Sequence, residues 1–303
     1  MSPLRAALIR SLCYTDTIDY PPTLAEWMAW LDRGSSTVTS REDVLEEVQR
    51  LCVEQVVVER EGRFVFPGRE ALIALHAERA HFMPRKLRTA RRVTSWLRRI
   101  QGVRFVALCN TTALGHARDL GDLDFFVITR ANTIWQTRGW AALPFKLFNR
   151  RPRADQEIAD AVCLSFFLDE TALDVQALSL KGEDPYLRYW FLSLLPLYDD
   201  GIGRVLWDQN INLRARHTFA SPWIVNPDFI RPTPTLRIPT SSFFEPFAHR
   251  AQKRVFPTAI QHPDVQETGV VCNDHVLKFH TQDARADIRA RYETMCQRYE
   301  VQP

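Results

Sequence analysis

Two aspartates one residue apart stand at the start of an apolar segment, "GDLDFFVIT" at residues 121–129. Side chains at positions i and i+2 of a strand point to the same face, so Asp122 and Asp124 would lie side by side. Adjacent carboxylates repel each other unless a positive charge lies between them, and a divalent metal ion is the obvious candidate. The alternative is a pair of loop aspartates that cap the start of a strand. This segment alone leaves both interpretations open.

The composition is that of an ordinary soluble globular protein, with 303 residues of which 46% are hydrophobic and 25% are charged. This length allows two domains, or one large domain with appendages. No apolar stretch approaches the roughly 18 residues needed to span a bilayer, and the first residues show no signal-peptide cleavage pattern. We therefore expect a cytoplasmic protein without a membrane partner. The six cysteines form no CxxC pair, so neither a zinc site nor a disulfide framework is predicted.

The basic residues are unevenly distributed along the chain. The formal net charge of +3 is too small to indicate a nucleic-acid partner by itself. The segment 85–99, however, carries no acidic residue and seven basic ones, Arg85, Lys86, Arg88, Arg91, Arg92, Arg98 and Arg99. A helix there would present either a solvated face or a cationic wall for phosphates, and its place just before the aspartates favours the wall.

The first 68 residues show the order of elements found in a winged helix. Helical spacing begins at Pro3, and Thr23 followed three residues later by Glu26 predicts a capping box at the start of a second helix. Ser40 is a plausible cap for a third helix. The apolar residues expected to bury one face of that third helix are Val44, Leu45, Val48 and Leu51. A hairpin around Glu61-Gly62 follows, which completes a predicted winged-helix domain at 1–68.

Winged helices often bind DNA through their third helix, and the charges of this one argue against that role. The stretch 40–55 carries the acidic residues Glu42, Asp43, Glu46, Glu47 and Glu54 against the basic residues Arg41 and Arg50. A phosphate backbone would repel such a helix. DNA binding is therefore disfavoured, and a role in packing, in dimerisation or in holding a protein partner is expected instead.

The remaining residues divide into three predicted regions. A basic helical connector at 69–100 is broken near Pro84, because proline disrupts a continuous helix. A core at 101–180 contains the apolar strands "VRFVALCN", "LDFFVIT" and "AVCLSFFL", with the helix "NTIWQTRGWAALPFKLF" before the last of them. We expect a helical lobe at 181–303, which includes a long helical stretch at 184–210 and an irregular proline-rich connection at 220–263.

The stretch "FVALCNTTALGHARDLGDLDFFVIT" resembles the signature of the DNA polymerase beta-like nucleotidyltransferase superfamily. In that superfamily an apolar strand ends in a Gly-Ser turn, a helix follows, and a later strand carries Asp-x-Asp. Further blocks resemble an uncharacterised bacterial and archaeal branch with an N-terminal winged helix: "TDTIDYPPTLAEW", "NTIWQTRGW", "AVCLSFFLDE", "DPYLRYWFLSLLPLY" and "VLKFHTQDAR". The resemblance implies an α+β protein in which a winged helix precedes a mixed sheet with flanking helices and a mainly helical C-terminal region.

The resemblance also implies a chemistry. Enzymes of this kind use Mg²⁺ to move a nucleoside monophosphate from an NTP to an acceptor, here unidentified. Asp122 and Asp124 would then be the catalytic metal ligands, and Asn110 and Thr111 the turn that contacts phosphates. The cationic residues expected to contact the nucleotide are Arg138, Arg91 and Arg92.

Two departures from the superfamily pattern leave a second hypothesis open. Asn110-Thr111 stands where relatives have Gly-Ser, although asparagine tolerates left-handed backbone geometry better than most residues. Active members usually carry a third carboxylate on a later strand, where this chain presents Cys163 and Ser165, with Asp160 just before them. The alternative is therefore a degenerate member that binds a nucleotide or a protein partner without turnover.

Four other residues have both a functional and a structural interpretation. Trp135 could stack on a base or belong to the core. His116 could contact substrate or be a partly exposed polar residue. Asn210 and Asn212 could face a cleft, or could hydrogen-bond to a neighbouring loop.

Overall fold

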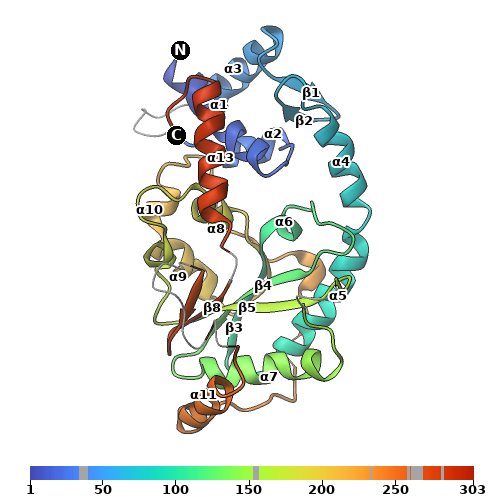
Figure 1. Ribbon diagram of the computed structural model, residues 1–303, viewed down its shortest axis with the longest axis vertical. Coiled ribbons are helices and arrows are strands. Elements are labelled where there is room, and N and C mark those ends of the chain that lie inside the picture. The colour runs from blue at the N-terminus through green and yellow to red at the C-terminus, as the bar shows by residue number, and fades with distance from the viewer. Residues whose placement is uncertain (34–39, 153–156, 233, 258–259, 261–268, 281–282) are drawn as a thin grey trace.

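The computed structural model describes residues 1–33, 40–152, 157–232, 234–257, 260, 269–280 and 283–303. It is an α+β structure built around a six-stranded mixed sheet (Figure 1). A small helical unit with a two-stranded hairpin lies at the top of that view, and the sheet with its helices lies below it. The predicted α+β class with a mixed sheet and flanking helices is therefore confirmed. In the part of the chain that the structure describes, no helix is both long and apolar enough to span a bilayer.

The N-terminal elements follow the predicted order of three helices and a hairpin. They are α1 (Pro3–Thr17), α2 (Leu24–Ala29), α3 (Arg41–Val53), β1 (Val58–Arg60) and β2 (Arg63–Val65). Thr23 and Glu26 form the expected capping box, and Ser40 caps α3 as expected. Glu61 and Gly62 both have positive φ angles, 53° and 71°, which is the backbone geometry of a tight two-residue hairpin turn.

The buried face of α3 differs from the predicted stripe at one position. Val44, Val48 and Leu51 are buried, but Leu45 is 40% exposed and Glu47 takes the inward position instead. Positions 44, 47, 48 and 51 follow the i, i+3, i+4, i+7 pattern of one helix face, and position 45 lies off that face. Arg5 of α1 pairs with the inward Glu47 at 3.5 Å.

The N-terminal core is completed by the end of the chain. Helix α13 (Arg285–Arg298) packs along α1 and contributes Tyr292 and Cys296 to the core that contains Leu12 and Trp27. Arg10 also donates to the carbonyl oxygen of Gln302 at 2.7 Å. The core around residues 1–68 therefore includes side chains from α13.

The main sheet has the strand order β6-β3-β4-β5-β8-β7. Its strands are β3 (Val103–Leu108), β4 (Leu123–Thr129), β5 (Val162–Asp169), β6 (Leu195–Asp199), β7 (Val270–Cys272) and β8 (Val276–Phe279). β4 and β5 pair in parallel, and the other neighbouring strands pair antiparallel. The sheet thus extends beyond the predicted core at 101–180, because β6, β7 and β8 come from the region expected to be a helical lobe.

That error has a physical cause. β6 has the sequence "LPLYD" and directly follows an apolar helix, so the apolar run at 184–210 resembles one long buried helix. β7 and β8 have only three and four residues, which is too short for an alternating pattern to identify them.

Helices cover both faces of the sheet. On one face lie α5 (Met83–Leu97) and α7 (Ile134–Leu147), with α11 (Glu245–Lys253) packed on α7 (Figure 1). On the other face lie α8 (Pro185–Leu192), α9 (Ile202–Gln209) and α10 (Ile211–Arg214). Helix α11 lies inside the segment 220–263, where an irregular connection was expected.

The remaining elements are short connections or lead into the sheet. Helix α4 (Ala71–Ala80) precedes α5, and Pro84 stands in the first turn of α5, so the break in the predicted helical connector is confirmed. Among the described residues, the other elements are α6 (Asn110–Ala113) and the 3₁₀ helices η1 (Val175–Leu178), η2 (Pro227–Phe229) and η3 (Ser242–Phe244).

The alternation along β4 decides which way the aspartates face. Leu123, Phe125 and Val127 pack in the core beneath α5 and α7. Phe126 and Ile128 pack in the core beneath α8 and α9. Because side chains alternate along a strand, Asp122 and Asp124 belong to the α8 side of the sheet.

The two leucines of α3 provide a test of the N-terminal core. Replacing Leu51, which is fully buried, by alanine should lower the free energy of unfolding by about 2–4 kcal/mol, because it removes buried methyl groups and leaves a cavity. The matched Leu45→Ala change on the same helix should cost less than about 1 kcal/mol, because Leu45 is exposed. Urea unfolding followed by circular dichroism measures both; equal losses would contradict this orientation of α3.

Candidate functional site

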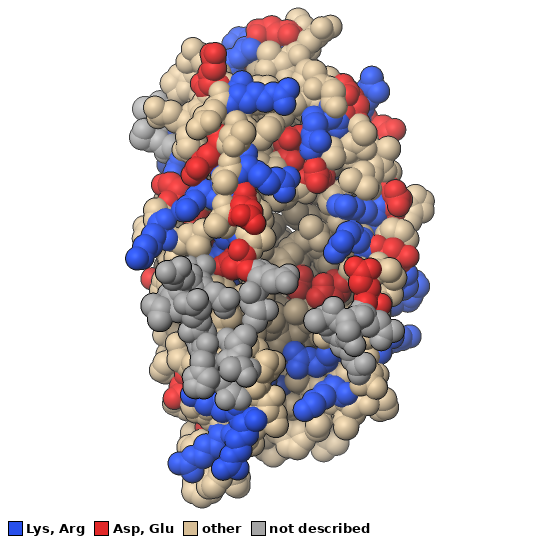
Figure 2. All heavy atoms as spheres, in the orientation of Figure 1, with Lys and Arg blue, Asp and Glu red and all other residues tan. Residues whose placement is uncertain are grey.

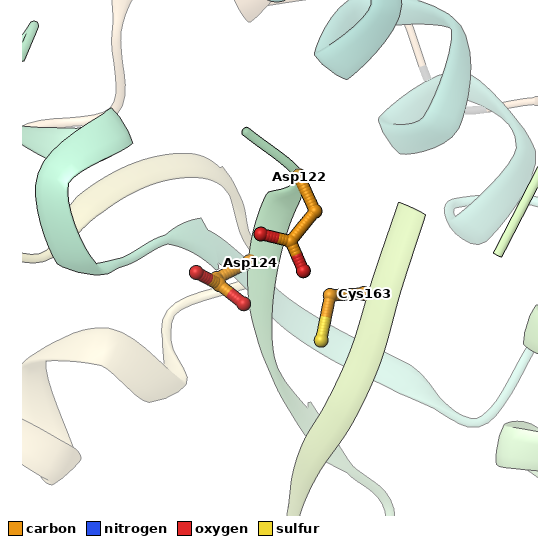
Figure 3. Close-up of side chains that lie close together, drawn as sticks. All are labelled: Asp122, Asp124 and Cys163. Atoms are coloured by element: carbon orange, nitrogen blue, oxygen red, sulfur yellow. The ribbon is translucent and has the colours of Figure 1, made fainter. Parts of the chain in front are cut away.

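Asp122, Asp124 and Cys163 come together at the junction of β4 and β5 (Figure 3). Each offers one potential ligand atom, and these atoms all lie within 4.8 Å of one another. Asp124 lies inside β4 and is paired with Cys163 across the parallel β4–β5 ladder, while Asp122 directly precedes β4. The two aspartates therefore lie side by side as their spacing predicts, and Asp124 is a strand residue rather than a loop cap.

The pair carries negative charge that the protein does not fully neutralise. Burial and the neighbouring carboxylate of Asp122 raise the pKa of Asp124 to about 6, although the hydrogen bond from Asn110 acts in the opposite direction. Burial also raises the pKa of Asp122 above its ordinary value. A bound cation would relieve both effects, because an opposite charge favours the ionised form.

The turn at Asn110-Thr111 supports this pair directly. Asn110 has a φ of 58°, in the left-handed region that asparagine tolerates. Its Nδ2 donates to Asp124 Oδ2 at 2.8 Å, and its Oδ1 accepts a hydrogen bond from the Tyr186 hydroxyl at 2.7 Å. The Asn110 side chain thus holds the carboxylate of Asp124 in place, while Thr111 lies exposed in the same wall of the site.

The expected position of a third carboxylate is occupied by a chain of neutral groups. Cys163 Sγ lies 3.2 Å from Ser165 Oγ, which in turn lies 3.0 Å from His280 Nε2. Burial and the two aspartates raise the pKa of Cys163 well above its ordinary value, so this residue is a thiol at neutral pH. Burial, with Lys278 nearby, lowers the pKa of His280 to about 4, so its imidazole is neutral as well.

Asp160 does not supply the missing carboxylate. Its Oδ1 lies 3.0 Å from Lys86 Nζ, and its Oδ2 lies 3.0 Å from Arg85 Nε. The fully buried Lys86 also donates to the carbonyl oxygens of Asp119 and Gly121, at 3.3 and 2.5 Å. These two basic residues of α5 therefore fix the loop that leads into Asp122, a positioning role that the sequence analysis missed.

A pocket of about 760 Å³ opens beside the aspartates, and Figure 2 shows this face of the molecule hollowed in its middle. Asn110, Thr111, Asp122 and Asp124 all line it, so the structure brings these four predicted site residues together. Lys278, His280 and Arg285 line it as well, although the sequence analysis did not single them out. Lys278 and His280 stand at i and i+2, a spacing that would have indicated a shared face if the strand at 276–279 had been recognised.

The three arginines expected at the nucleotide lie elsewhere, since none of them is among the described residues that line this pocket. Arg138 is only 6% exposed; its guanidinium lies 4.8 Å from the ring centres of Phe256 and Phe279, and it donates to Gln252 Oε1 at 2.5 Å. Arg91 lies 5.6 Å from the ring centre of Phe229, and Arg92 is exposed on α5. The structure therefore gives no support to these residues as phosphate contacts.

Four residues with open interpretations take structural positions. Trp135, a residue of α7, is fully buried in the core on the α5 and α7 side of the sheet. His116 is also fully buried, with its two ring nitrogens 3.0 Å from His76 Nδ1 and 2.6 Å from Arg79 Nη1, so the expectation of a partly exposed residue was wrong. Asn210 braces a neighbouring loop by hydrogen bonds with Val175 N and Leu173 O, and Asn212 is exposed away from the pocket lining.

In comparisons with known proteins, no family model, curated protein or solved structure matches this chain.

The raised pKa of Asp124 predicts that its ionised carboxylate lowers the free energy of unfolding at neutral pH. A carboxyl group whose pKa of about 6 in the folded protein exceeds its ordinary value of 3.8 binds its proton more tightly in the native state, so its contribution to stability falls as the pH rises through that window. Without divalent cations, Asp124→Asn should raise the free energy of unfolding at pH 7 by roughly 1–3 kcal/mol, and the gain should vanish near pH 4.

Thermal unfolding at the two pH values in a chelating buffer measures this effect. Asparagine keeps an oxygen that accepts the hydrogen bond from Asn110, so the substitution removes mainly the charge. Asp228→Asn is the control, because Asp228 is exposed and should give no such gain. A midpoint for Asp124→Asn that is no higher than that of the wild type at pH 7 would contradict the prediction.

Proposed function

We propose that this protein is a divalent-metal-dependent nucleotidyltransferase, which moves a nucleoside monophosphate from an NTP to an acceptor hydroxyl. The observation that carries the proposal is the pair of adjacent, incompletely neutralised carboxylates, Asp122 and Asp124, in the wall of a pocket large enough for a nucleotide. Pockets of roughly 300–1,000 Å³ are typical of small-molecule sites. The resemblance of residues 105–129 to polymerase beta-like enzymes points to the same chemistry.

The donor atoms suit Mg²⁺ in part. Carboxylate oxygens are the hard ligands that Mg²⁺ takes, and the raised pKa of Asp124 indicates a place where a cation is favoured. Cys163 would not be a Mg²⁺ ligand, so the other positions would fall to phosphate oxygens and water. When bound, Mg²⁺ would supply charge stabilisation for the triphosphate at the reacting phosphorus.

The other groups of the pocket bind and orient. Lys278 and Arg285 offer positive charge for a polyphosphate, and Arg285 is fixed by Asp184 at 3.0 Å. Tyr186 holds Asn110, which holds Asp124, so this carboxylate is oriented before any ligand arrives. Phe166 and Trp190 form an apolar wall that limits water around the reacting groups.

A second candidate is a nucleotide-binding protein without turnover, and a specific observation favours it. Cys163 occupies the expected place of the third carboxylate, and Asp160 is bound to Arg85 and Lys86 instead of reaching the cluster. With two carboxylates, the activating metal is held by fewer protein ligands than in the superfamily pattern. A cytoplasmic location and a protein partner or dimer contact through the N-terminal helices remain predictions.

Nucleotide binding is the first property to test. Isothermal calorimetry with ATP, GTP, CTP and UTP should show binding that requires Mg²⁺. The double variant Asp122→Asn/Asp124→Asn should weaken it at least about tenfold, because the metal-binding charge is removed, which corresponds to about 1.4 kcal/mol. Asp228→Asn is the control and should bind like the wild type. Failure of all four nucleotides to bind the wild type would rule out both candidates.

The substitution Cys163→Asp separates the two candidates. It places a carboxylate beside Asp124 on the paired strand, where the superfamily pattern has its third acidic residue. Pyrophosphate release by the wild type that is abolished in Asp124→Ala would establish the transferase. Pyrophosphate release by Cys163→Asp but not by the wild type would establish that the wild type binds a nucleotide without turnover. Cys272→Asp, at a half-buried cysteine on β7 outside the pocket lining, is the control and should leave pyrophosphate release unchanged.

A further inference from the structure

The pocket continues beyond the aspartates toward the N-terminal helices. At that end it is lined by residues from α1 and from the segments after α1, α2 and α6, and by one residue of α13. We call these residues the aromatic end: Tyr14, Ile18, Trp30, Leu114 and Ile288. None of them carries a charge, and two of them are aromatic.

The charged residues of the pocket lining form a second set. Of the lining residues that the structure describes, the charged ones are Asp122, Asp124, Lys278, Asp283 and Arg285. The aspartates come from the start of β4, and the others come from β8, from the segment after it and from the start of α13. The pocket therefore has a charged part suited to a metal and a polyphosphate, and an uncharged part that meets it on α13, where Arg285 and Ile288 lie one turn apart.

The aromatic end is held in shape without a ligand. The Tyr14 ring stacks on the Tyr189 ring of α8 with a centroid separation of 3.8 Å. The Trp30 ring contacts the Tyr189 ring edge-on, with a centroid separation of 6.3 Å. Tyr14 is almost fully buried, so its ring cannot move aside without disturbing the N-terminal core. A binding surface that is already ordered loses little conformational entropy when a ligand binds.

We propose that the aromatic end binds the acceptor, and that the acceptor is an uncharged small molecule with an aromatic or aliphatic body and a hydroxyl group. This inference rests on the proposed transferase function. The acceptor oxygen forms a bond to the α-phosphorus of the NTP, and the bond from that phosphorus to the bridging oxygen breaks. Pyrophosphate leaves with the bonding electrons, and the hydroxyl proton passes to solvent.

A polynucleotide acceptor does not suit this pocket. Single strands bind along a track of cations that follows their phosphates. The cations among the described lining residues are Lys278 in β8 and Arg285 at the start of α13, and two cations supply no track along a strand of phosphates. Walls from α1, α8, α13 and the sheet surround a volume in the range of small-molecule sites.

The test uses 4-fluorobenzyl alcohol as the probe, followed by fluorine NMR titration of the full chain with Mg²⁺ and a non-hydrolysable ATP analogue present. The probe should bind, and Ile18→Glu should weaken it at least about tenfold, because the change places a charge at the aromatic end. Val53→Glu is the matched control on an exposed apolar residue and should leave probe binding unchanged. Leu114→Gln is a second variant, for use if Ile18→Glu does not fold.

Calorimetry of the ATP analogue on the same samples keeps the two proposals separate. Unchanged nucleotide binding together with lost probe binding in Ile18→Glu supports the acceptor site. Nucleotide binding by the wild type without probe binding, or displacement of the probe by a deoxythymidine decamer, overturns the acceptor inference and leaves the proposed function standing. Absence of nucleotide binding by the wild type overturns the proposed function itself.

Discussion

The repulsion between two carboxylates held side by side is the constraint around which this site is built. Asp122 and Asp124 are placed on one face of β4 by the pleat of the strand, and burial prevents water from screening them fully. The surrounding residues hold this arrangement in place rather than neutralise it. Asn110 and Tyr186 fix Asp124 from one side, and Lys86 fixes the loop before Asp122 from the other. Such an arrangement is typical of a site whose positive charge arrives with a ligand.

Much of the local structure could be predicted from the sequence, because it depends on neighbouring residues. The caps at Thr23 and Ser40, the hairpin turn at Glu61-Gly62 and the break near Pro84 are set by side chains within a few positions of each other. The convergence of Asp122 with Asp124 follows from strand periodicity alone. The left-handed backbone of Asn110 could be expected from the tolerance of asparagine for positive φ.

Other features could not be predicted because they depend on contacts between segments far apart in the sequence. Patterns of neighbouring residues do not reveal such contacts. Arg138 follows a candidate catalytic strand, yet Phe256 and Phe279 from far along the chain enclose its guanidinium. Lys278 and His280 reach the pocket only because the four-residue strand β8 pairs with β5. Leu45 was expected on the buried face because it is apolar, as its neighbour Val44 is. A step of one residue along a helix turns the side chain away from that face, so only Val44 is buried.

Helix α13 affects the order in which the protein folds during its synthesis. Its first residue, Arg285, lies in the wall of the pocket, and its later residues Tyr292 and Cys296 complete the core around α1. During synthesis on the ribosome the aspartate strand emerges long before this helix does. Until then, the partial chain lacks Arg285 in the pocket lining, and it lacks the residues of α13 that pack against α1. The pocket is therefore complete only once α13 has emerged and packed against α1.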